Sequence, residues 1–332
     1  MYRQGAPQLA SLALVVIGMA HGAAIRAQLP AEPDELEAAA VIGERPGPAL
    51  WRVSHEGRTL WILPTLAPLP QKVTWRSKEV EEVIAQAQEV YTEGSLDLRI
   101  GGNGADNERI LQALANPGHK WLREVMPADI YAQFNALNMR YAGGDARLEI
   151  FRPFYAALEL RKRALTQLQL NSDGQVHATI GFLARKHYVK QLGMGMVLAP
   201  RPAQLIGKLQ RVPASVDNEC ARWQLLQLER ELRDAMARAN AWSAGDMQAL
   251  RQDWEASRRQ RQQASCTQLL QAIAPTERAI RETRRRNLRA LEKALQKNRT
   301  TFALMMLEDM FDPDGLLAGL RAAGYLVEEP RS

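Results

Sequence analysis

Five histidines are the side chains in this sequence best suited to bind a metal ion or to transfer a proton near neutral pH. Helical zinc sites need two histidines at a fixed spacing, as in His-x-x-x-His. No two histidines here have that spacing: His21 lies in an apolar leader and His55 in a predicted turn, and three more stand far apart, namely His119, His177 and His187. The histidines by themselves therefore predict no metal site.

Motifs for nucleophilic and nucleotide chemistry are also missing. The sequence has no Gly-x-Ser-x-Gly elbow, no phosphate-binding loop with Gly-Lys-Ser/Thr, and no dinucleotide fingerprint. The glycine-rich run at residues 101–104 falls in a predicted loop and lacks the strand-to-helix context that such a fingerprint needs. No serine or cysteine has an assignable base, so the motifs indicate neither a serine or cysteine hydrolase nor a nucleotide enzyme.

A basic ridge is the strongest charged feature. Residues 278–299 hold nine basic side chains against Glu282 and Glu292, which gives this segment +7, while the whole chain is +6 and the remainder sums to −1. Five of the nine recur every four residues and share one helix face: Arg281, Arg285, Arg289, Lys293 and Lys297. The ridge predicts either a solvated helix face or a site for lipid head groups or polyanionic glycans, because arginine recognises phosphate well. A charge confined to one helix does not predict a nucleic-acid partner.

The N-terminus has the pattern of a secretory signal. Arg3 precedes an apolar run at residues 9–20, and small residues follow, with cleavage expected after Ala24 or Ala27. The run is short for a membrane span, so we expect residues 1–27 to be removed and the protein to be periplasmic or secreted. A buried N-terminal helix is the alternative. Residues 28–47 are rich in Ala, Glu and Pro and predict a flexible linker.

The first elements after the linker predict the start of a sheet. Residues 49–54 and 59–63 are apolar runs, and Glu56-Gly57 supplies a hairpin turn between them. Three prolines mark residues 64–70 as a loop. A helix is predicted from Ser77, as N-cap, to about Tyr91.

The remainder of the chain alternates helices with short strands. This order predicts a helix-rich α/β fold in which a central mixed β-sheet is flanked by helices. The predicted strands are residues 90–98, 188–192, 302–307 and 325–328, and the predicted helices are residues 103–114, 127–138, 148–170, 175–185, 200–210, 217–242, 247–273, 276–298 and 316–323.

Residues 217–273 predict an antiparallel helical hairpin inserted on the sheet core. Apolar residues recur at alternating spacings of four and three from Ala221 to Trp242, Gly245 can end this helix, and Asp246 can cap the next. Cys220 and Cys266 lie equally far from that turn, so the hairpin places them opposite each other and predicts a disulfide. Two buried thiols are the alternative.

Several stretches resemble the TraB/GumN family, whose relatives include Tiki-type metalloproteases. That family follows two strands with a Gly-Thr-x-His loop, where this chain has Pro64-Thr65-Leu66-Ala67, then Leu69-Pro70 and Trp75. Two more stretches resemble the sequences of family members: Ala241-Trp242-x-x-Gly245-Asp246 and residues 284–330. Counting back from Asp314-Gly315 places the second family motif on residues 306–309. The resembling stretches cover most of the chain after the linker and are densest in residues 48–98 and 284–330, and we take residues 48–330 as one domain.

The resemblance implies that active relatives hold a divalent metal with two Gly-x-x-His motifs and nearby acidic residues. Here Ala67 and Asp309 replace both histidines, and Pro64 and Met306 replace both glycines. The remaining oxygen ligands that the resemblance suggests, all weak catalytic candidates, are Glu93, Glu308 and Asp309. It also suggests pocket or anion-binding residues, which are Thr65, Arg286 and Asn287.

From these residues we expect an exported relative without catalytic activity or metal cofactor that acts in binding or interaction in the cell envelope. Its partner would be an envelope protein, an anionic lipid or a glycan that contacts the basic ridge. The alternative is a metal-dependent hydrolase of peptides or esters, with a divalent ion held by carboxylates alone.

Overall fold

A computed structural model describes residues 47–71, 73, 75, 77–92, 104–171, 174–195, 201–262, 266, 269 and 277–330. The predicted signal, nearly all of the predicted linker, and Glu93 lie outside these residues. Within the described part, no helix combines the length and the apolar character that crossing a membrane requires.

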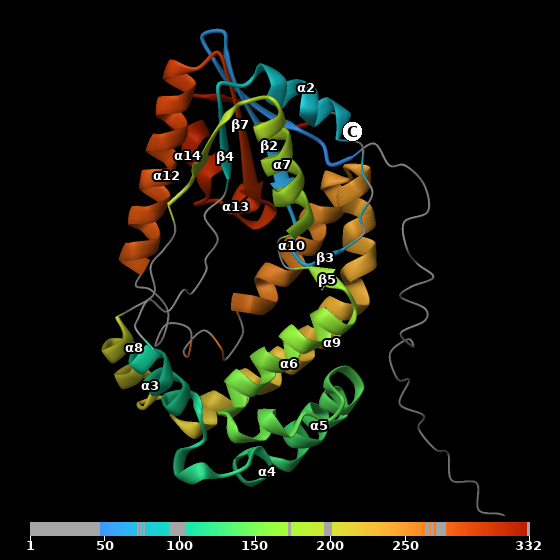
Figure 1. The fold of residues 1–332 in the computed structure, drawn as a ribbon, viewed down its shortest axis with the longest axis vertical. Helices are drawn as coiled ribbons and strands as arrows, with labels where there is room; N and C mark the ends of the chain where they lie inside the picture. The colour runs from blue at the N-terminus through green and yellow to red at the C-terminus, as the bar shows by residue number, and fades with distance from the viewer. Residues whose placement is uncertain are drawn as a thin grey trace, which may run out of the picture. The chain divides into compact units, whose positions relative to one another are not determined.

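A mixed six-stranded sheet forms the core, in the order β6-β4-β7-β2-β1-β8 (Figure 1). Its strands are β1 (Trp51–His55), β2 (Arg58–Thr65), β4 (Glu89–Thr92), β6 (Lys190–Gly193), β7 (Thr300–Met306) and β8 (Leu326–Glu328). The four strands β6, β4, β7 and β2 run parallel, and β1 runs antiparallel to both of its neighbours. The predicted α/β class, with a central mixed sheet among many helices, is confirmed.

The hairpin β1–β2 turns where the sequence predicts. Glu56 and Gly57 both have positive φ, 46° and 76°, as a two-residue hairpin turn that follows the twist of the strands requires. Val53, Leu60 and Ile62 of the two strands are fully buried. The hairpin therefore forms from local turn chemistry and is fixed by its apolar side chains.

Helices cover the sheet on both sides. Figure 1 shows α12 (Glu277–Lys297) and α14 (Leu316–Ala322) to one side of the strands, with α2 (Lys78–Gln86) and α7 (Gly174–Lys186) to the other. α12 contacts α14, β2 and β7, whereas α2 contacts α7 and β7. The short helix α13 (Leu307–Phe311) follows β7 directly.

A second apolar core lies between helices. It joins α5 (Ala128–Ala142), α6 (Pro153–Gln167) and the long helix α9 (Ala214–Ala244). Every position of the predicted seam from Ala221 to Trp242 is at most 3% exposed. Gly245 ends α9 with φ 73°, and Asp246 Oδ1 accepts a hydrogen bond from the amide of Ala249 in α10 (Met247–Gln262). The seam, the end of α9 at Gly245 and the start of α10 at Asp246 agree with the sequence prediction.

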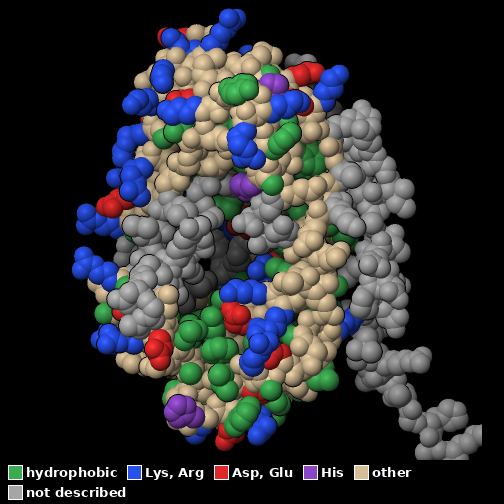
Figure 2. All heavy atoms as spheres, in the orientation of Figure 1, with side chains coloured by type: hydrophobic (Ala, Val, Ile, Leu, Met, Phe, Trp, Pro, Cys, Tyr) green, Lys and Arg blue, Asp and Glu red, His purple; other side chains and the backbone are tan. Residues whose placement is uncertain are grey.

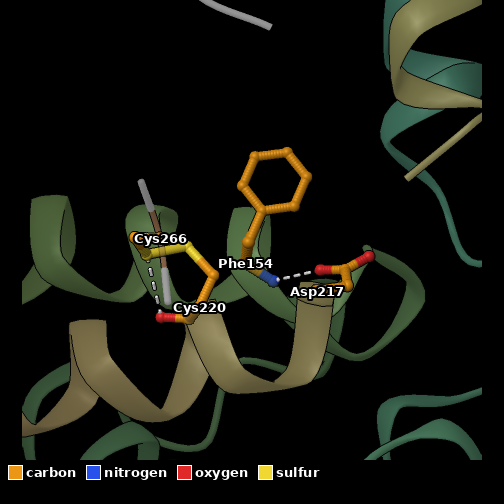
Figure 3. Close-up of a disulfide and its surroundings, with 4 residues drawn as sticks. All are labelled: Phe154, Asp217, Cys220 and Cys266. Carbon is orange, nitrogen blue, oxygen red and sulfur yellow. Dashed lines mark hydrogen bonds between the residues drawn. A yellow bond between two sulfur atoms is a disulfide. The ribbon is translucent and has the colours of Figure 1, made fainter. Parts of the chain in front are cut away.

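A third cluster surrounds the start of α9. It includes side chains of α3 (Gly104–Leu114), α8 (Pro202–Leu209) and α6 together with Cys220 and Cys266, which form a disulfide as expected. Beside it, the carboxylate of Asp217 accepts hydrogen bonds from the Phe154 amide at 2.9 Å and from Arg152 Nε at 2.7 Å. Figure 3 shows Cys220 and Asp217 close together on α9, with the disulfide partner Cys266 and Phe154 of α6 beside them. The connections η1 (Pro117–His119), α4 (Leu122–Val125) and η2 (Ala146–Ile150) complete this helical region.

Several predicted boundaries are wrong. The helix predicted to reach Tyr91 ends at Gln86, and Ser77 precedes it without a side-chain cap. Residues 148–170 divide into η2 and α6, because the residue before Pro153 takes an extended conformation, ψ 147°. The predicted loop at 64–70 begins inside β2 and ends in β3 (Leu69–Pro70), which pairs with β5 (Leu170–Asn171). Leu307, predicted to end a strand, begins α13.

Candidate functional site

The carboxyl ends of four parallel strands meet at one edge of the sheet. β2 ends at Thr65 and β7 at Met306, and these two residues are direct partners in the ladder. The pairing brings residues 64–67, here called the first motif segment, beside residues 306–309, the second motif segment. Ligands of open α/β sheets bind beyond this edge of the strands, so the geometry makes it the candidate site.

The end of α9 holds the first motif segment in place. Trp242, fully buried, donates its indole N–H to the carbonyl oxygen of Pro64 at 2.9 Å. Arg238 Nη2 donates to the carbonyl oxygen of Ala67 at 3.0 Å. Thr65 is buried within the segment. The loop thus offers the site an alanine methyl group where the family motif has an imidazole.

The second motif segment forms the first turn of α13. Asp309 lies 3.5 Å from Arg284 Nε of α12, and the same guanidinium donates to Asp312 at 2.8 Å. Gly315 closes the following turn, and a Cβ there would stand 1.9 Å from the Asp309 carbonyl oxygen. Only glycine fits this turn, which fixes where Glu308 and Asp309 lie.

Asn287 of α12 reaches the same edge from the other side. Its amide group donates to the carbonyl oxygen of Gly195 at 3.1 Å and accepts from the Gly195 amide at 2.7 Å. Gly195 follows β6 by two residues, so Asn287 ties the end of β6 to α12. Arg286 donates to the hydroxyl of Thr283 at 2.9 Å. Arg286 and Asn287, two of the three residues suggested for the pocket, thus bond within the protein.

A cavity of about 360 Å³ opens between the two motif segments and the helices. Ala67 and Glu308 belong to its wall, and so do charged side chains of α6, α9 and α10: Arg161, Arg230, Arg238, Glu231, Asp234 and Asp253. Arg161 and Glu231 pair through two hydrogen bonds of 2.6 Å. Two buried atoms of the wall, Arg238 Nε and Gln224 Oε1, have no hydrogen-bond partner among the described residues. The wall therefore carries both signs of charge and spare hydrogen-bonding groups.

The polar wall of α9 is the part of the site that sequence reasoning missed. Arg230, Asp234 and Arg238 recur every four residues beside the apolar seam, and all three line the cavity. This i, i+4, i+8 row was available in the sequence as a signal. Arg238 also lies 3.8 Å from Asp253, which connects α9 to α10 across the cavity.

The residues at this edge do not fit a divalent metal of the type the family resemblance implies. Ala67 has no side-chain donor atom, and Asp309 already faces Arg284. No group of three His, Cys, Asp or Glu side chains that could hold a metal ion occurs among the described residues. Of the suggested oxygen ligands, Glu308 and Asp309 share one helical turn, whereas Glu93 lies outside the described residues.

The fold and the site define an α/β protein with a polar, charged cavity beyond the ends of its parallel strands. The chain belongs to the TraB/PrgY/gumN family, whose model matches residues 49–329. No curated protein and no solved structure matches the chain. The family resemblance stated from the sequence is thereby confirmed.

Proposed function

We propose that this protein is an exported member of its family that binds a ligand at the strand-end cavity and does not hydrolyse it. One observation carries the proposal. The β2–β7 ladder places the two motif segments side by side, and an arginine contacts the residue that replaces each histidine. Arg238 donates to the backbone carbonyl oxygen of Ala67, and Arg284 lies 3.5 Å from the carboxylate of Asp309.

These arginines oppose metal binding for two physical reasons. A guanidinium about 5 Å from a divalent cation would repel it by roughly 7 kcal/mol at an effective dielectric constant near 20. Asp309 could ligate an ion only by giving up or sharing its contact with Arg284, and Ala67 offers no side-chain donor at all. A metal-activated water, the usual nucleophile of such a hydrolase, therefore has no support from these residues.

The cavity suits a small polar ligand instead. Its volume of about 360 Å³ lies in the range of small-molecule sites, and its wall has both hydrogen-bond donors and acceptors. Arg238 Nε, which lies 3.8 Å from Asp253, and Gln224 Oε1 form no hydrogen bond with other described residues, and a ligand in the cavity would supply one to each. These features support binding through hydrogen bonds and charge at this site.

Export is part of the proposal and rests on separate features. Residues 1–27 have the pattern of a secretory signal, and the disulfide between Cys220 and Cys266 suits an oxidising compartment. We propose that the mature protein acts in the periplasm or outside the cell. Fractionation of the producing cells and N-terminal sequencing test this. A protein that is found in the cytoplasm and still carries residues 1–27 would contradict it.

Metal content and hydrolysis test the central claim. The mature protein is purified, dialysed against Mn²⁺, Co²⁺ or Zn²⁺, and analysed for bound metal and for hydrolysis of a peptide and ester library. We expect no stoichiometric metal and no hydrolysis. The matched variant Ala67→His with Asp309→His should bind Co²⁺ or Zn²⁺ more tightly than the parent. Stoichiometric metal in the parent, together with hydrolysis that Glu308→Gln abolishes, would establish the carboxylate-based hydrolase instead.

A further inference from the structure

The outer face of α12 carries a dense row of positive charge. The ridge residues Arg281, Arg285, Arg289, Lys293 and Lys297 are all exposed, and so is Arg286 beside them. The opposite face of the helix buries Leu291, Ala294 and Leu295 in the main core. Burial of that face fixes the rotation of the helix, so the ridge points permanently outward. Figure 2 shows Lys and Arg side chains along the flank that α12 occupies in Figure 1.

The protein neutralises only part of this charge. Glu282 pairs with Arg278 at 2.7 Å. This hydrogen bond is the main cause that lowers the pKa of Glu282, and attraction to Arg286 and Arg285 lowers it further. Lys297 lies 3.5 Å from Glu89. Arg285, Arg289 and Lys293 form no salt bridge within the part of the chain that the structure describes. The three cations in the middle of the ridge are therefore available to bind an external anion.

An apolar groove runs beside the ridge. It lies between α12 and α14, measures about 650 Å³, and has Arg281 and Arg285 on its rim. Aliphatic residues and a glycine of the two helices form most of its wall, and Arg284 and the turn before α14 complete it: Ile280, Leu288, Leu316, Ala318, Gly319, Ala322, Pro313, Asp314 and Gly315. A surface that places apolar area next to a row of cations matches an amphiphile, which has an anionic head and a hydrocarbon part.

We propose that the ridge and groove of α12 form a docking surface for a phospholipid bilayer with anionic head groups. Arg285, Arg289 and Lys293 rise by about 6 Å from one to the next and turn by about 40° each time, so these three cations can face one flat surface. Each Lys or Arg near such a surface strengthens binding about fivefold. A polyanionic glycan would use the same charges but would leave the groove without a role. The proposal is independent of what the strand-end cavity binds.

Vesicle binding by the mature full chain tests the proposal. Vesicles of phosphatidylcholine alone are compared with vesicles that also contain phosphatidylglycerol, in a flotation assay at several salt concentrations. We expect binding to the anionic vesicles only, and weaker binding as salt rises, because salt screens exposed charges. The variant Arg285→Gln, Arg289→Gln, Lys293→Gln should lose about 100-fold in affinity.

A matched variant separates the ridge from net charge. Arg109→Gln, Lys120→Gln, Arg211→Gln removes the same charge from exposed positions outside α12 and should keep the parent's affinity. In the groove, Ala322→Glu adds a carboxylate at an exposed helix position and should weaken binding about fivefold.

Three results would overturn the proposal. The first is equal binding to neutral and anionic vesicles. The second is an equal loss in the ridge variant and the matched variant, which would leave only a net-charge effect. The third is binding of dextran sulfate at lower concentration than anionic vesicles with no effect of Ala322→Glu on either, which would identify a polyanionic glycan as the partner.

Discussion

Asp217→Asn tests how far the helical region depends on one buried ion pair at the start of α9. Asp217 and Arg152 are 2% and 6% exposed. Arg152 also donates to the carbonyl oxygens of Leu209 and Val212, so a single side chain joins α6 to the connection between α8 and α9. Burial raises the pKa of the Asp217 carboxyl, and attraction to Arg152 opposes that rise.

The size of the effect follows from what the substitution leaves behind. Asp217 accepts from two donors, the Phe154 amide and Arg152 Nε, whereas asparagine has one acceptor oxygen and must turn its NH₂ group toward the other donor. The Arg152 cation would also remain buried without a counter-charge. Breaking a buried pair in this way costs about 3 to 5 kcal/mol. For a unit of this size, that corresponds to a fall in Tm of roughly 6 to 10 °C.

Thermal unfolding of the parent, Asp217→Asn, Arg152→Gln and the double variant measures the coupling of the pair. We expect the double variant to be much less destabilised than the sum of the two single variants, by about 2 kcal/mol or more. Glu282→Gln, which breaks the exposed pair with Arg278, is the control and should leave Tm almost unchanged. Additive single effects, or an Asp217→Asn Tm equal to that of the control, would refute the reasoning.

Three further predictions concern the disulfide, the turn after α13 and the sheet. Reducing the Cys220–Cys266 bond, which spans 46 residues, should cost about 4 kcal/mol and lower Tm, and thermal unfolding with and without reductant measures this. Gly315→Ala should destabilise by about 1 to 3 kcal/mol because its Cβ meets the Asp309 carbonyl oxygen, whereas Gly207→Ala in α8 has open space and should be neutral or stabilising; chemical denaturation compares the two. Burial acts to raise the pKa of Glu89, but hydrogen bonds from Asn298 and Tyr91 outweigh it and lower that pKa below its ordinary value of 4.5. A carboxyl whose pKa is lowered by folding stabilises the folded state above its ordinary pKa, and this stabilisation is lost on acidification. The parent should therefore have a larger free energy of unfolding than Glu89→Gln at neutral pH, and the difference should shrink as the pH falls below about 4.5. A difference in unfolding free energy that grows in acid would contradict the lowered pKa of Glu89.

Elements with a strong local signal were predictable from the sequence. The turn at Glu56-Gly57, the seam of α9 and the pair Gly245-Asp246 are fixed by residues within a few positions of each other, and all three agree with the structure. The C-terminal end of α2 was missed because an apolar residue such as Val90 fits a helix face and a buried strand equally well. The break before Pro153 was missed because the apolar residues on either side of it suggest one continuous helix.

The candidate site was predictable only in part, for a related reason. Sequence reasoning placed the two motif segments, but it gave no partner for their side chains. Arg238 and Arg284 reach them from α9 and α12, helices whose docking on the sheet depends on packing between distant residues. Both amide atoms of Asn287 bond to Gly195, a residue 92 positions away that the sequence did not indicate as its partner. No short-range pattern carries such contacts.

The strand order has a consequence for how this protein is made. β1 and β2 leave the ribosome long before the strands that they pair with: Arg52 of β1 bonds to Glu328 of β8, 276 positions later, and β2 pairs with β7. Until then, both hairpin edges stay open to other chains, and contacts of such long range form slowly. Proteolytic loss of residues 300–330 would therefore split the sheet, because it removes β7 and β8. The hairpin β1–β2 would then have two unpaired edges and would be prone to aggregate.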